Sequence, residues 1–131
     1  MERFIIEQAS HFGMDKTVET ILQAAEIKGW SNPATHDLQQ SLAKAGKHVK
    51  PVKVIEICKP EYSGKMLELN EERIISVMMP CRISIYEKND GKTYVSILNS
   101  GLMTQGVTES VAKAIQGAFD ESMEIIKSVL G

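Results

Sequence analysis

The stretch that decides the fold runs from Val52 to Ile97. Its first part reads Val52-Lys-Val-Ile-Glu-Ile-Cys58-Lys-Pro60. Its last part reads Met78-Met-Pro80-Cys81-Arg-Ile-Ser-Ile-Tyr86-Glu-Lys-Asn-Asp90-Gly91-Lys-Thr-Tyr-Val-Ser-Ile97. Both cysteines of the chain lie in this stretch, and each flanks a strand-like run beside a proline and a basic residue. The two cysteines therefore stand in similar local surroundings.

This stretch predicts two kinds of element. The β-branched run 52–57 favours a mostly buried strand. Pro60 suits the first position of a helix over about 60–69, where its missing N–H is not needed, so Cys58 would lie just outside a helix N-terminus. The alternating runs 82–87 and 92–98 flank Asn89-Asp90-Gly91, which is a strong hairpin signal. Residues 74–79 suit a strand or a buried turn.

Helical spacing dominates the two ends of the chain. Apolar residues predict a helix over about 15–28, with Asp15 as N-cap and Gly29 as the stop. The segment 30–36 reads as extended or turn, and a short helix over about 37–45 follows, capped by Asp37 or Thr35. A long C-terminal helix over about 107–129 should pack on the sheet. The run at residues 4–6 is too short to assign to a strand or a helix.

Together these elements predict one α+β domain spanning residues 1–131. Its 131 residues suit a single core. We expect two layers, with a largely antiparallel sheet and the helices packed on one face.

Composition excludes several partner classes. Apolar residues make up 43% and charged residues 24% of the chain, as in ordinary globular proteins. The net charge is −2 and the Lys and Arg residues are spread along the whole chain, which argues against a nucleic-acid surface. No apolar run is long enough for a membrane span, and the N-terminus lacks a signal-peptide pattern. We therefore expect a soluble cytoplasmic protein with no nucleic-acid or membrane partner, in which the cysteines are thiols.

The cysteines are the first candidate site. A helix N-terminus and a neighbouring cation, here Lys59, both stabilise the thiolate of Cys58. Cys81 has Arg82 beside it. A small buried hydrophobe is the commoner role of a free cysteine and is the simpler interpretation of both. Antiparallel strands would bring the two thiols to one edge, whereas a crossover between parallel strands would place them roughly 17 Å apart.

The sequence gives weaker support to two further kinds of chemistry. A shared thiol site could hold a transient disulfide or a soft metal such as Cu(I) or zinc on Cys58 and Cys81, with Met78, Met79 and His36 nearby. The chain has no CxxC or HxxxH spacing, however, and methionines are more often core residues. His36-Asp37 suggests acid–base chemistry, but a capping Asp beside a solvated His explains the pair equally well. No catalytic motif decides whether the protein is an enzyme, and no cofactor is indicated.

The sequence resembles the family called Domain of Unknown Function 302. The resemblance covers nearly the whole chain and lies in these segments: Lys53-Val-Ile-Glu-Ile-Cys58-Lys-Pro60-Glu-Tyr62, Met78 to Gly91, Gly29-Trp30, Thr35-His36-Asp37-Leu38 and Ala45-Gly46-Lys47. It implies a compact α+β domain that tends to form dimers, with no established activity. The family usually has Asn at the position of Lys59 and often Leu at that of Met79, and other members replace one or both cysteines.

Two functional hypotheses follow. The first is a homodimeric domain that binds a small ligand or partner near the Cys58 and Cys81 loops, with Lys59, Arg82 and His36 as further site candidates. The second is a thiol-based redox or soft-metal-handling protein that uses Cys58 and Cys81.

Overall fold

The fold is built on one sheet of five antiparallel strands in the order β1-β5-β4-β3-β2. The structure is a computed structural model that describes residues 3–131. The strands are β1 (Ile5–Ala9), β2 (Ser31–Asp37), β3 (Val52–Cys58), β4 (Cys81–Glu87) and β5 (Thr93–Leu98). The helices are α1 (Met14–Ile27), α2 (Leu38–Lys44), α3 (Pro60–Leu67) and α4 (Glu109–Lys127), with short 3-10 helices η1 (Glu71–Met78) and η2 (Ser100–Met103).

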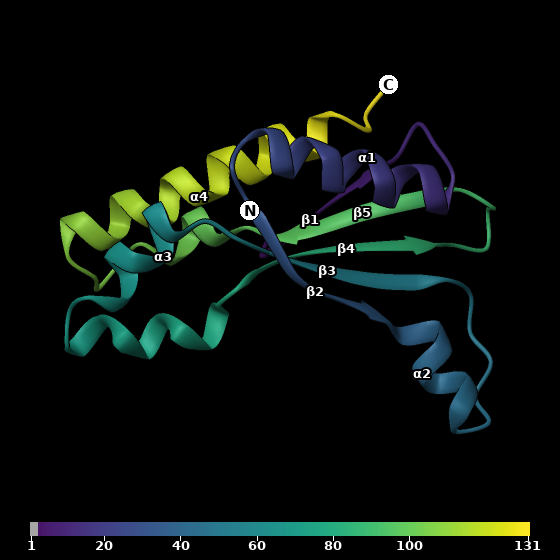
Figure 1. Ribbon diagram of the computed structural model, residues 1–131, viewed down its shortest axis with the longest axis horizontal. Coiled ribbons are helices and arrows are strands. Elements are labelled where there is room, and N and C mark those ends of the chain that lie inside the picture. Colours follow the sequence, from purple (N-terminus) through teal and green to yellow (C-terminus); the bar gives the residue numbers. More distant parts are fainter. Residues whose placement is uncertain (1–2) are drawn as a thin grey trace.

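The helices are distributed unevenly around the sheet. Figure 1 shows α1 and α4 side by side over the sheet, with α3 and η1 at one end and α2 at the opposite end. Alternation along the strands fixes which side chains meet the helices. Ile55, Ile57, Ile83, Ile85 and Val95 are all buried under them. The other face carries Glu7, Val54, Arg82, Ser84, Tyr86, Tyr94 and Ser96, none of which is fully buried. We call it the open face.

The predicted α+β class with an antiparallel sheet is confirmed, and so is the hairpin. Gly91 in its turn has φ +78°, a conformation that favours glycine. The C-terminal helix is α4, whose buried face includes Val111, Ile115, Ala118, Ser122 and Ile126. In residues 3–131 no helix combines the length and apolarity that crossing a membrane requires.

Four local details differ from expectation or resolve it. The N-cap of α1 is Gly13, without a side-chain cap, so the prediction of Asp15 was wrong, and Asp15 lies in the first turn. Asp37 does cap α2, because its side chain accepts from the Gln40 N–H at 2.9 Å. The ambiguous segment 74–79 falls mostly in η1, and the segment before α2 is an edge strand rather than a turn.

The strands β4 and β5 part before they end. Their pairing runs from Glu87 opposite Thr93 to Ile83 opposite Ile97. Beyond that point Cys81 and Arg82 pair with β3, whereas Leu98 pairs with β1. We call this separation the fork. It lies at the end of the sheet where β4 follows η1.

Candidate ligand pocket and thiol site

A cavity of about 420 Å³ lies at the fork. Its inner part is lined from the helix side, by Met66, Ile75, Met78, Cys81, Ile97, Ile115, Ala118, Phe119 and Ser122. Its outer part is lined from the open face, by Ile5, Val54, Arg82, Ser84, Ser96 and Leu98. Val77, Met79, Pro80 and Ser100 complete the wall. The lining comes from both faces of the sheet because β4 and β5 no longer pair there.

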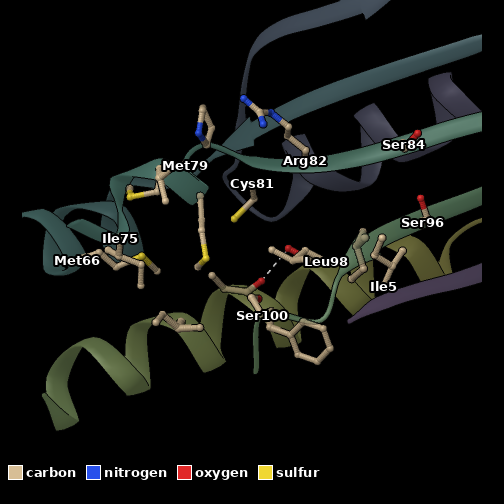
Figure 2. Close-up of a pocket in the computed structure, with 18 of the residues that line it drawn as sticks. Ile5, Met66, Ile75, Met79, Cys81, Arg82, Ser84, Ser96, Leu98 and Ser100 are labelled. Carbon is tan, nitrogen blue, oxygen red and sulfur yellow. Dashed lines mark hydrogen bonds between the residues drawn. The ribbon is translucent and has the colours of Figure 1, made fainter. Parts of the chain in front are cut away.

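The two parts differ in chemistry. Figure 2 shows Met66 and Ile75 at one end of the pocket, facing α4, and Ser84 and Ser96 at the other end on the strands. Met66 and Ile75 are 6% and 8% exposed, so the inner part is shielded from water. Ser84 and Ser96 are direct cross-strand partners, which places two hydroxyls together on the open face. The pocket therefore has an apolar end and a polar end.

Arg82 supplies the charge of the polar end. Its Nε lies 3.6 Å from Glu56 Oε2, and the same oxygen lies 3.1 Å from His36 Nε2. The Glu56 side chain is 14% exposed and that of Arg82 is 57% exposed. Arg82 lines the pocket and Glu56 does not. Of Arg82, Glu56 and His36, it is therefore the Arg82 guanidinium whose charge a ligand in the pocket can reach.

The two thiols lie at the same end of the sheet. The strands β3 and β4 are antiparallel, and Cys81 is the direct partner of Ile57, the residue before Cys58. Both cysteines are free and half-buried. The Sγ of Cys58 lies 3.7 Å from the Ser63 hydroxyl. Burial, and secondarily the neighbouring Cys58, raise the pKa of the Cys81 thiol, so this group is mainly protonated at neutral pH.

The ammonium group of Lys59, the residue after Cys58, forms ion pairs with two carboxylates. Its Nζ lies 2.9 Å from Glu121 Oε1 and 3.6 Å from Glu61 Oε2. The hydrogen bond to Glu121 holds the pKa of Lys59 above its usual range. In the structure, the shorter ion pair of Lys59 is therefore with a carboxylate of α4.

Glu121 joins three segments of the chain. It accepts hydrogen bonds from the Trp30 indole at 3.0 Å, from Lys59 at 2.9 Å and from the Tyr62 hydroxyl. The bond to Glu121 raises the pKa of Tyr62 to about 12. Burial raises the pKa of Glu121, but the bonds from Tyr62, Lys59 and Trp30 outweigh it and lower the pKa overall. Gly117 makes room for the Tyr62 ring, since a Cβ there would lie 2.6 Å from Tyr62 Cε1.

The remaining candidates are dispersed. His36 stands opposite Val54, whereas Cys58 stands opposite Ser31 at the other end of β2. The structure does not bring His36 to the thiols. Met78 and Met79 do line the pocket with Cys81. Within residues 3–131 no group of three or more His, Cys, Asp and Glu side chains is arranged to hold a metal ion.

Sequence reasoning missed most of the pocket. Ser84 and Ser96 read as solvent-facing positions of a hairpin, and Ala118, Phe119 and Ser122 read as ordinary positions on or beside the apolar face of the long helix. Glu121 carries no local signal either, since its partners lie 59 to 91 residues away. Cys81 and Arg82 were identified through their similarity to the Cys58 segment.

The comparisons with known proteins agree with this architecture. A family described as domain of unknown function DUF302 matches residues 6–129. The crystal structure of an uncharacterized conserved DUF302 protein from Bacillus stearothermophilus has a TM-score of 0.86 and 16% sequence identity, covering 98% of this chain and 99% of that one. At that identity the likeness concerns the fold alone. A comparison with curated proteins found no significant match.

The Glu121 cluster predicts a pH-dependent contribution to stability. Glu121→Gln should lower the free energy of unfolding at neutral pH by about 1–3 kcal/mol, because hydrogen bonds to a charged acceptor are lost. Since the folded pKa of Glu121 lies below its ordinary value of 4.5, the contribution is present above that value and lost as pH falls through the folded pKa. Urea unfolding of both proteins should show a stability gap that is full well above pH 4.5 and shrinks as the pH falls below that value. A gap independent of pH would contradict the role of the carboxylate.

Proposed function

Because the chain belongs to the DUF302 family, whose function is unknown, we propose the function from its own pocket: it is a homodimeric domain that binds a small ligand at the fork. The observation that carries the proposal is the cavity of about 420 Å³ with an apolar and a polar end. Small-molecule sites are typically cavities of this order with mainly apolar walls and a few placed polar groups.

The location of the pocket supports binding rather than a packing defect. Empty space inside a core costs stability, and interiors are normally filled to high density. Here the walls are methionine, isoleucine and phenylalanine side chains that converge from α3, η1 and α4, with Cys81 at the mouth of the inner part. Methionines adapt their shape to a bound molecule more readily than branched residues do.

Filling the inner part should abolish binding without unfolding the protein. Ala118→Leu places extra methylenes into the cavity that Ala118 lines. We expect the neutral dye Nile red to bind the native protein with a rise in fluorescence, and this variant to lose that binding with little change in Tm.

Ala114→Leu is the matched control. Ala114 is as buried as Ala118, at 3% exposed, but does not line the cavity. Overpacking there should cost about 1–3 kcal/mol of stability and leave dye binding intact. Equal dye binding by native protein and Ala118→Leu would contradict the pocket as the binding site.

The rim of the pocket supports the dimer. Val77 is 81% exposed, Ile5 57% and Leu98 39%, and all three line the cavity. Ile74, on η1 close to Val77, is also 81% exposed. Exposed apolar side chains gathered around a cavity mark a candidate interaction surface. A second copy seated on it would cover the mouth of the pocket and complete the site.

A charge on the rim should separate the copies. We expect native protein to sediment as a dimer and Val77→Glu as a folded monomer with an unchanged circular dichroism spectrum, because the side chain is exposed within one copy. Ile27→Glu is the control, since Ile27 is 86% exposed on α1 and does not line the cavity. A native monomer at all concentrations, or equal dissociation by both variants, would overturn the dimer proposal.

Thiol chemistry is the second candidate, and the specific observation in its favour is the placement of Cys58 and Cys81 at one sheet end. Under this proposal Cys58 is the nucleophile or metal ligand and Cys81 its partner, the site lying beside the pocket. Free thiols also support a cytoplasmic location, which we propose together with the absence of a nucleic-acid partner. The raised pKa of Cys81 weighs against this candidate, because thiolates are the reactive form.

Alkylation against pH separates the two candidates. The midpoint for Cys81 should lie above the ordinary free-thiol value of about 8.5, and Cys58→Ser should lower it only in part, because burial is the larger cause. Mass spectrometry of each labelled cysteine gives both midpoints. A midpoint well below the ordinary value at Cys58, the proposed nucleophile, would favour thiol chemistry, and one at Cys81 would contradict the burial argument.

A further inference from the structure

We propose that the ligand of this pocket is an amphiphilic carboxylate, with its carboxylate on Arg82 and its apolar chain between α4 and η1. This inference rests on the proposed function and names the chemical class of its ligand. It follows from the arrangement of one accessible cation at one end of the cavity and an apolar chamber at the other.

The charge balance at the outer end favours an anion. Arg82 is the charged residue of the lining, and its side chain is 57% exposed. Its contact with Glu56 joins Nε to Oε2 at 3.6 Å, which is too long for a good hydrogen bond, so the guanidinium keeps N–H donors for a ligand. A carboxylate matches that fork of N–H donors in a bidentate geometry.

A cationic head group would be disfavoured at the same place. Glu56 is the nearby carboxylate, but its side chain is 14% exposed and its Oε2 already meets both His36 and Arg82. A cation entering the outer part would approach Arg82 before it could reach Glu56. The hydroxyls of Ser84 and Ser96 also line the outer part, and they could donate to lone pairs that the carboxylate oxygens keep when Arg82 binds them.

The inner part accounts for the apolar chain. Its walls of Met66, Ile75, Met78, Ile115 and Phe119 offer thioether, aliphatic and aromatic contacts. Burying a chain there removes apolar surface from water, worth about 0.8 kcal/mol for each methylene that is fully buried. The passage through the fork connects this chamber to Arg82, so a linear molecule can occupy both ends at once.

Displacement of Nile red by three matched compounds tests the inference on the full-length protein at neutral pH. Decanoic acid, decanol and decylamine share a chain and differ in the head group. We expect decanoic acid to displace the dye at the lowest concentration and decylamine at the highest. Arg82→Gln should weaken the binding of decanoic acid about five- to ten-fold and leave the binding of decanol unchanged.

Two further variants make the result specific. Lys113→Gln removes the same charge from an exposed position of α4 outside the cavity, and should change neither compound. Glu56→Gln removes the carboxylate that competes for Arg82, and it should strengthen the binding of decanoic acid only. If decanoic acid is no better than decanol, or if Lys113→Gln weakens it as much as Arg82→Gln, the carboxylate inference is overturned while the pocket stands. If the native protein binds neither dye nor any of the three compounds, the proposed function fails and this inference with it.

Discussion

The loss of pairing between β4 and β5 is the constraint on which the site depends. Backbone N–H and C=O groups of a sheet need partners, and a strand that leaves one neighbour must keep the other. Here Cys81 and Arg82 keep β3, while Leu98 keeps β1 and the Asn99 N–H continues that pairing by donating to the Phe4 carbonyl at 2.6 Å. At this end the sheet therefore divides into two parts, β4 with β3 and β5 with β1, and each of these strands keeps one paired neighbour. Side chains line the space between these two parts of the sheet.

The Glu121 cluster stabilises the same end of the molecule from the helix side. It links the segment after α1, through Trp30, and the start of α3, through Lys59 and Tyr62, to the middle of α4. A half-buried carboxylate is tolerated only with partners, and here a cation and two neutral donors supply them. Because Phe119, Ser122 and Glu121 are neighbours on α4, the cluster also fixes the helix that forms one wall of the pocket.

Local signals were sufficient for part of this architecture. The hairpin was predictable because Asn89-Asp90-Gly91 specifies its own turn, and α4 because its apolar spacing persists over nearly twenty residues. The segment that forms β2 could be assigned only as extended or turn, since Ser31-Asn-Pro-Ala-Thr-His-Asp37 is polar and lies at an edge where pairing with β3 supplies the structure.

The candidate site was only half predictable for a related reason. Antiparallel strands would place both cysteines at one end of the sheet, and that alternative is the one the sheet adopts. The cavity itself depends on where β4 and β5 stop pairing, and on residues of α3, η1 and α4 that meet only in three dimensions. No local pattern reports either fact. The ion pair of Lys59 could not be predicted, because its partner Glu121 lies 62 residues away.

The measurement that tests the central claim most directly is methyl NMR of the methionines during titration with decanol, a probe without charge. Met66, Met78 and Met79 line the pocket, while Met14 and Met123 pack against the core elsewhere. If the fork holds a ligand pocket, the first three methyl signals shift together along one saturable curve and the last two stay in place. If none of them shifts, or if Met14 and Met123 shift as far as the others, the cavity at the fork is not the binding site.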